Sequence, residues 1–292
     1  MSPSTRLNYE RSWKSCTSFL SSLNIDPSLP VKEETIALYV THLWKCDLKP
    51  STIRSTLSAV SFYLKINLLP VPCNSYLVRQ TLKGAEKNTT RRKPRLRPIQ
   101  KDLLYSMIAI IPILFPDPYE RILYQALLIT AYFCCLRAGE AVISNSSSHT
   151  LLREQITLEI SPYDHYLIQF RSFKHCDHSN EKFILKKSND SFCPVNLLNN
   201  YLHVRPSVPG PLFVLFSGKP LNRSIYSKLI KSCIKKLGHD NSLYNTHSIR
   251  IGRATDLAID GAQPDVIKRI GRWSSSAYLK YIRLEHFILP TS

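Results

Sequence analysis

Apolar residues recur at intervals of three or four through the first part of the chain, a spacing that places them on one face of a helix. Trp13, Cys16 and Leu20 show this spacing in the stretch that begins at residue 4. Further stretches of the same kind follow, separated by proline-containing breaks such as NIDPSLPVKEE. The predicted helices cover residues 4–24, a stretch from near residue 32, residues 51–67 and residues 75–86. The pattern therefore predicts a small all-helical bundle.

The rest of the chain predicts a second, mostly helical domain that contains a small antiparallel sheet. Long apolar stretches such as LLYSMIAIIP and ERILYQALLITAYFCCLRAGEAV are typical of helices. Between residues 151 and 187 the pattern changes to three short β-rich stretches, REQITLEIS, HYLIQFRSFKH and EKFILKK, separated by turn-forming residues. Helical spacing returns from Pro194 and includes the final SSSAYLKYIRL. The expected fold class is mainly α.

A basic segment separates the two predicted domains. The sequence KGAEKNTTRRKPRLRPIQ combines prolines with a run of cations, as linkers do. We therefore predict a helical domain over residues 1–90, a linker over 91–98 and a second domain over 99–292. The cationic run fits a nuclear-localisation signal or a strap along a nucleic-acid backbone. The candidate phosphate contacts are Arg54, Arg91, Arg92, Lys93, Arg95 and Arg97.

Charge indicates the class of partner. The chain has 39 Lys and Arg against 21 Asp and Glu, a formal charge of +18 and a pI near 9.6. Such a balance favours nucleic acid, because cations that contact phosphates release condensed counterions. Nucleic acid, either DNA or RNA, is therefore the first candidate. No apolar run has the length of a membrane span and the N-terminus does not resemble a signal peptide, so we expect a protein of the nucleus, or of the cytoplasm in a prokaryote.

Cysteine usage argues against a disulfide framework and against a metal site. The eight cysteines include no Cys-x-x-Cys pair and are scattered through apolar stretches, which indicates free thiols in a reducing compartment. The one tight cluster, His175-Cys176-Asp177-His178, has no second half at ligand spacing. We therefore expect no metal and no cofactor.

Several side chains that can act on a phosphate occur in the second domain. Arg137 follows an apolar run, so it is expected near the interior, where Glu140 lies one helical turn later and can pair with it. Lys174 lies between two predicted strands. His247 and Arg250 are three residues apart, which places both on one face of a helix. Each of these, taken alone, has an ordinary structural explanation.

In this order, however, the residues resemble the signature of the tyrosine recombinases, the phage-integrase family. The matching pieces are LRAGE, FKHCD, HSIR and the terminal GRW…YIR. The ending looks most like recombinases of eukaryotic mobile elements, the DIRS and Ngaro retrotransposons and the Cryptons. The first domain is similar by architecture only. The catalytic residues that the resemblance implies are Arg137, Lys174, His247, Arg250, Trp273 and Tyr281, with Glu140 in support.

Two positions have alternatives. In the family, a His or a Trp precedes the nucleophilic Tyr at a fixed spacing. Arg272 stands at that spacing from Tyr281 and Trp273 is one residue closer, so either can fill the His-or-Trp position. Residue type favours Trp273. Tyr278 is the alternative nucleophile, three residues before Tyr281. The context YIR, which matches the end of the family's motif, favours Tyr281.

The resemblance implies a site-specific recombinase or integrase of a mobile element. Such an enzyme clamps duplex DNA between its two domains and cuts and rejoins it through a 3′-phosphotyrosine, without ATP or metal. It usually works as a tetramer on two duplexes. Two other functions fit the same residues: a domesticated DNA-binding protein that has lost catalysis, and an enzyme similar to type IB topoisomerases.

Overall fold

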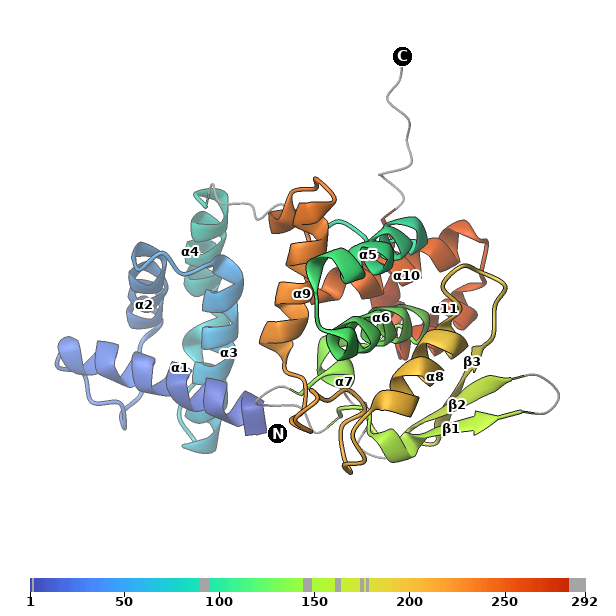
Figure 1. The fold of residues 1–292 in the computed structure, drawn as a ribbon. Coiled ribbons are helices and arrows are strands. Elements are labelled where there is room, and N and C mark those ends of the chain that lie inside the picture. The colour runs from blue at the N-terminus through green and yellow to red at the C-terminus, as the bar shows by residue number, and fades with distance from the viewer. Residues whose placement is uncertain are drawn as a thin grey trace, which may run out of the picture. The chain divides into compact units, whose positions relative to one another are not determined.

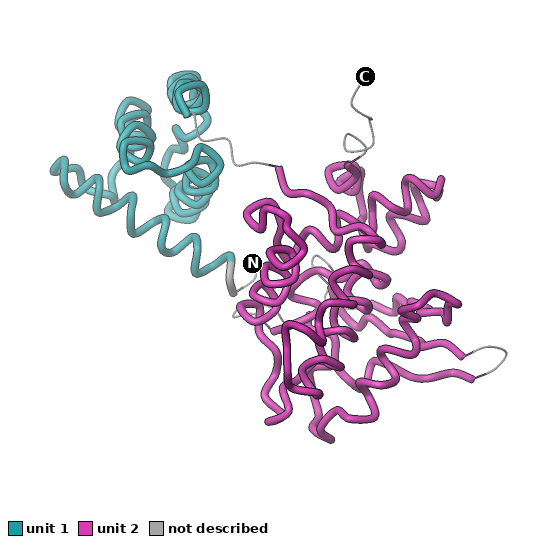
Figure 2. Tube along the Cα trace, turned by 45° about the horizontal axis from the view of Figure 1, so that its top comes forward, with its two compact units in different colours: residues 1–93 teal, residues 94–292 magenta. Residues whose placement is uncertain are grey.

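The chain folds into two compact units, which Figure 2 colours separately. Unit 1 comprises Met1–Lys93 and unit 2 comprises Pro94–Ser292, so the division falls inside the predicted linker. The structure, a computed structural model, describes residues 1, 3–89, 95–143, 149–160, 164–173, 176 and 179–283.

Unit 1 is a bundle of α-helices around an apolar core (Figure 1). Its helices are α1 (Pro3–Ser22), α2 (Glu33–Lys45), α3 (Pro50–Ile66) and α4 (Tyr76–Lys87), with a 3-10 turn, η1, at Pro72–Asn74. Ile36, Tyr39 and Leu64 are fully buried between them. The predicted helices are confirmed, because the apolar stripe of each one faces this core.

Unit 2 is also mostly helical (Figure 1). Its α-helices are α5 (Lys101–Leu114), α6 (Pro118–Phe133), α7 (Ala138–Ala141), α8 (Pro194–Val204), α9 (Arg223–Lys236), α10 (Thr246–Ile259) and α11 (Pro264–Gly271). Short 3-10 turns lie at Arg153–Gln155 (η2), Asn241–Leu243 (η3) and Ser276–Lys280 (η4). Local sequence sets the helix starts: Asp117, for example, accepts the amide of Glu120 at 2.8 Å just before α6.

The sheet of unit 2 has the antiparallel order β1-β2-β3. The strands are β1 (Ile156–Glu159), β2 (His165–Phe170) and β3 (Glu181–Lys186). In β2, Tyr166, Ile168 and Phe170 are buried and alternate with more exposed residues, as a half-buried strand requires. The predicted mainly α fold with a small antiparallel sheet is therefore confirmed.

Two predicted elements were wrong in detail. Arg153–Gln155, expected to begin the first strand, forms η2, because Gln155 turns back and accepts the amide of Leu152 at 2.7 Å. The stretch SSSAYLKYIRL, expected to be a helix, contains the 3-10 helix η4 and then a turn. The guanidinium of Arg283 donates to the carbonyls of Lys280 and Ile282, which would accept backbone amides if the helix continued.

The start of unit 2 is fastened to α10. The amide of Arg97 donates to the carbonyl of Leu243 at 2.9 Å. The amide of Ile99 donates to the backbone carbonyl of Ser248, also at 2.9 Å. The chain crosses α10 at Gly252, where an added Cβ would lie 1.7 Å from the carbonyl oxygen of Ile99. Glycine is thus required for this close approach. The last part of the predicted linker belongs to unit 2.

Candidate active site

The N-terminal half of α10 carries two of the predicted catalytic residues. Asn245 caps this helix, since its side chain accepts the amide of His247 at 2.7 Å. Arg250, one turn later, is fully buried and donates hydrogen bonds to the carbonyls of Cys135 and Gly271. Its guanidinium is therefore fixed from two sides by backbone oxygens.

A buried ion-pair network surrounds Glu140. This carboxylate accepts hydrogen bonds from Arg137 Nη1 at 2.7 Å and from Arg272 Nη2 at 2.6 Å. Arg137 Nη2 in turn donates to the backbone carbonyl of Arg272 at 3.1 Å. The Arg137 side chain remains 21% exposed and that of Arg272 only 3%. Arg137 can thus meet a ligand, whereas Arg272 acts inside the protein.

The backbone conformation of Arg272 decides which of two neighbours faces Tyr281. Arg272 ends α11 in the left-handed region, with φ 53°. Its side chain turns toward Glu140, and its guanidinium carbon lies 4.0 Å from the centre of the Phe170 ring. Trp273 is turned the other way, and its ring centre lies 4.8 Å from that of Tyr281. The geometry gives the position next to the tyrosine to Trp273.

One carboxylate faces three guanidinium groups in this cluster. Burial alone would raise the pKa of Glu140, but Arg272, Arg137 and Arg250 outweigh it, so the pKa lies below its usual value. Glu140 is therefore ionised at neutral pH. Burial lowers the pKa of Arg250 from its usual value, yet a guanidinium remains charged at neutral pH.

Tyr281 lies where three of the predicted residues meet. Its ring centre is 4.8 Å from that of His247, and the guanidinium carbon of Arg250 is 5.4 Å from it. The same carbon lies 4.1 Å from the centre of the Trp273 ring. Tyr278, in contrast, is only 8% exposed and packs in an apolar cluster. The structure brings Tyr281, rather than Tyr278, to His247 and Arg250.

Gly271 makes room for the Trp273 ring. A Cβ at this position would lie 1.7 Å from that ring, which no side chain could accommodate. The carbonyl of Gly271 also accepts a hydrogen bond from Arg250. The Gly-Arg-Trp sequence thus supplies an open space, a buried cation and an aromatic wall in consecutive positions.

The remaining candidates lie in unit 1, at the start of unit 2 or outside the described residues. Arg54 is exposed in unit 1 and forms an ion pair with Glu86. Arg95 and Arg97 are exposed at the start of unit 2. Outside the described residues lie Lys174, Arg91, Arg92 and Lys93.

His247 is held in its neutral form. The residue is exposed, but desolvation of the ring by its neighbours, followed by the charges of Arg250 and Arg137, lowers its pKa to about 4 from an ordinary 6.5. At neutral pH the imidazole therefore has a lone pair that can accept a proton. The centres of the His247 and Tyr281 rings are 4.8 Å apart.

This pKa shift predicts a pH effect on stability. Between pH 6.5 and about 4 the unfolded chain protonates His247 and the folded chain does not, so acidification favours unfolding. We expect the melting temperature to fall across this window, and to fall less steeply in His247→Gln. Differential scanning fluorimetry at half-unit pH steps measures the two slopes; equal slopes would contradict the shift.

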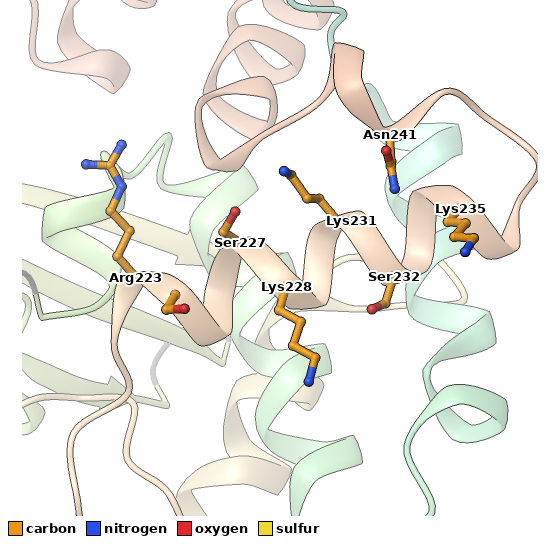
Figure 3. Close-up of a pocket in the computed structure, with 8 residues that line it drawn as sticks. Arg223, Ser227, Lys228, Lys231, Ser232, Lys235 and Asn241 are labelled. Carbon is orange, nitrogen blue, oxygen red and sulfur yellow. The ribbon is translucent and has the colours of Figure 1, made fainter.

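A basic groove along α9 was not predicted from the sequence. It has a volume of about 620 Å³ and is lined by Arg223, Ser224, Ser227, Lys228, Lys231, Ser232, Lys235 and Asn241 (Figure 3). The charge of Arg223 contributes to the lowered pKa of His247, so one end of the groove is electrostatically coupled to the candidate active site. Lysines at three- and four-residue spacing were the available signal, but this pattern is also typical of any solvated helix face.

Among the described residues there is no cluster of three or more His, Cys, Asp or Glu side chains that could hold a metal ion. In the same part of the chain no helix is long and apolar enough to cross a membrane.

Comparison with solved structures identifies the fold; no protein-family model and no curated protein matches the chain. The Tn1549 transposon integrase in complex with transposon right end DNA aligns over 97% of this chain and 90% of its own, with a TM-score of 0.63 and 18% identity. The XerH site-specific recombinase bound to its difH substrate aligns over 87% and 67%, with a TM-score of 0.61 and 17% identity. The lambda integrase dimer bound to a COC′ core site aligns over 100% and 75%, with a TM-score of 0.60 and 13% identity. The chain therefore has the fold of the tyrosine recombinases.

Proposed function

We propose that this protein is a DNA recombinase that cuts and rejoins DNA through a covalent bond between Tyr281 and a 3′ phosphate. The observation that carries the proposal is the position of the Tyr281 ring against His247 and Trp273, next to the buried guanidinium of Arg250. The fold, which is that of recombinases solved with bound DNA, supports it, as does the charge of +18.

The proposed first step is attack of the Tyr281 hydroxyl oxygen on the phosphorus of a phosphodiester, with departure of the 5′ oxygen. Negative charge on the non-bridging oxygens increases toward the pentacoordinate transition state. Arg137, oriented by Glu140, is the proposed contact with those oxygens, and the positive charge of the buried Arg250, which backbone carbonyls hold, supports it from within the protein. Removal of one preorganised donor of this kind typically costs about 3 kcal/mol.

Two proton transfers accompany this step. His247, neutral and in contact with the Tyr281 ring, takes the phenol proton. A bound phosphate raises the pKa of the imidazole through its negative charge, which makes it a better base. Lys174 is the proposed donor of a proton to the leaving 5′ oxygen. A second 5′ hydroxyl then attacks the phosphotyrosine and restores the DNA backbone without ATP.

The finer features of the proposal come from the resemblance of the chain's last motif. GRWSSSAYLKYIR looks like the ending of DIRS, Ngaro and Crypton recombinases, so we propose a recombinase of a mobile element. By the same resemblance the active assembly is a tetramer on two DNA duplexes. A mobile element of a eukaryote requires that the protein act in the nucleus.

The α9 groove is the proposed contact with the DNA backbone. Replacing Lys231 and Lys235 by Gln is expected to weaken DNA binding and to lower the slope of log affinity against log salt by about 2, since each phosphate contact contributes about 0.9. Fluorescence anisotropy at several salt concentrations measures this slope. Lys186 and Lys187, exposed at the end of β3, provide a control with the same charge change. Equal slopes for the two double variants would contradict the groove's role.

The proposed function is tested by trapping the covalent intermediate. Duplex DNA with a nick near the cleavage point loses a short fragment after attack, so the adduct cannot be resealed. We expect an SDS-resistant protein–DNA complex from a library of such duplexes. Sequencing the attached DNA and mass spectrometry of the attached peptide then give the target, the polarity and the nucleophile.

Two outcomes would favour the other functions. DNA binding without a trapped adduct under any condition would indicate a DNA-binding protein that has lost catalysis. Relaxation of supercoiled DNA by a monomer, without strand exchange, would indicate an enzyme similar to type IB topoisomerases.

A further inference from the structure

Thr255 lies in α10 and is fully buried. Its hydroxyl donates to the carbonyl of Ile251 at 2.8 Å and lies 3.3 Å from the carbonyl oxygen of Tyr281. The hydroxyl oxygen of Thr255 also accepts the backbone N–H of Arg283 at 3.1 Å. One side chain therefore contacts the backbone at Tyr281 and two residues beyond it.

The segment around Tyr281 is also held internally. Arg283 donates from its guanidinium to the carbonyls of Lys280 and Ile282, and the amide of Tyr281 donates to Tyr278 at 2.9 Å. The carbonyls of Lys280 and Ile282 thus both accept hydrogen bonds from Arg283. These bonds of Arg283 lie within the segment, whereas the bonds of Thr255 join the segment to α10.

We propose that Thr255 is a positioning residue for Tyr281. Its hydroxyl fixes residues 281–283 against the helix that carries His247 and Arg250, so that the phenol stays next to both side chains. The inference rests on the proposed function, because it concerns the same nucleophile. Donation to the carbonyl four residues earlier is ordinary for a helical threonine. The hydrogen bond from the Arg283 amide is not ordinary for a helical threonine. It joins the Thr255 hydroxyl to the segment that carries Tyr281.

The geometry explains why a small shift would matter. Attack on phosphorus requires the phenol oxygen at close range and in line with the leaving oxygen, and a displacement of about 1 Å can slow such a step by about 100-fold. Without the hydroxyl of Thr255, the amide of Arg283 would lose the hydrogen bond that joins it to α10. A segment that loses such an attachment can shift relative to the helix.

Thr255→Val tests the proposal, because valine keeps the shape of threonine and lacks only the hydroxyl. We expect the rate of adduct formation on the nicked duplex to fall by about 10- to 100-fold. The affinity for the same DNA should change by less than about twofold, because the hydroxyl contacts only protein. Thr255→Ser retains the hydroxyl, and its rate should lie within about threefold of the wild-type rate. A loss of rate without a loss of affinity, rescued by serine, is not expected of a residue that only fills the core.

Thr130 provides a matched control. It is fully buried in α6, and its hydroxyl has no hydrogen-bond partner within the described part of the chain. Thr130→Val therefore makes the same chemical change in the same unit without removing a hydrogen bond. We expect the wild-type rate of adduct formation in this variant.

Hydrogen–deuterium exchange gives a second readout that needs no activity. In Thr255→Val the amides of residues 279–283 should exchange at least about tenfold faster than in the wild type, because the attachment to α10 is lost. The Ser variant should exchange at the wild-type rate.

The failures of the two proposals can be told apart. A wild-type rate in Thr255→Val, or an equal loss in the Val and Ser variants or in Thr130→Val, would overturn the positioning role. An adduct that persists in Tyr281→Phe, or faster exchange in Thr255→Val with no adduct from the wild type, would overturn the proposed function and leave the attachment of the segment standing.

Discussion

Tyr281→Phe is expected to abolish the covalent DNA adduct, with a rate at least about 1,000-fold below that of the wild type. Phenylalanine fills the same space beside His247 and Trp273 but has no oxygen to attack phosphorus. DNA affinity should change by less than about twofold, because the groups proposed to contact phosphate are unchanged. Trapping on a nicked duplex measures the rate, and anisotropy measures the affinity.

Tyr278→Phe is the matched control, since it removes the same atom three residues earlier. The Tyr278 side chain is buried in an apolar cluster, and the ammonium nitrogen of Lys268 lies 5.8 Å from the centre of its ring. We expect this variant to form the adduct at close to the wild-type rate. An adduct that survives in Tyr281→Phe and disappears in Tyr278→Phe would assign the nucleophile to Tyr278.

Glu140→Ala is expected to destabilise unit 2 by about 3–5 kcal/mol, because removing one partner of a buried ion pair leaves charge uncompensated. The carboxylate is 2% exposed and bonds to both Arg137 and Arg272. Without it, three guanidinium groups remain near one another with no counter-charge from position 140. Adduct formation should be lost as well, since Arg137 would no longer be oriented.

The measurement must isolate unit 2. The chain has three tryptophans, of which Trp13 and Trp44 lie in unit 1, so replacing both by Phe leaves Trp273 as the reporter in urea unfolding. Asp164→Ala is the control, because its ion pair with Lys187 is about half exposed on both sides and such pairs contribute at most about 1 kcal/mol. Similar midpoints for the two variants would show that Glu140 does not stabilise the fold.

Elements with a regular pattern could be predicted from the sequence. The helices and the sheet follow from spacings of three to four and of two residues, because each element buries one face. Arg137 and Glu140 could be paired because they are three residues apart. The order of these residues with His247, Arg250 and Tyr281 resembled a family, and the structure brings His247, Arg250 and Tyr281 together.

Features that depend on contacts between distant segments could not be predicted. Nothing in Gly-Arg-Trp indicates that Arg272 adopts φ 53° and pairs with a carboxylate more than a hundred residues earlier. Thr255 appears in the sequence as one of many helical threonines, and its contact with the Tyr281 segment exists only once the end of the chain folds back. The final stretch failed as a helix for the same reason, because Arg283 takes the carbonyls that a helix would use.

The three guanidinium groups around Glu140 have a thermodynamic consequence for anion binding. Besides burial, the charges of Arg137 and Arg272 lower the pKa of Arg250, so an anion that binds there adds a favourable charge to the cluster. Binding of this kind favours the folded state, by about 2.7 kcal/mol at a ligand concentration of one hundred times Kd. Under the proposed function, a phosphodiester bound at this cluster would therefore act as a counterion that stabilises the fold as well as a reactant.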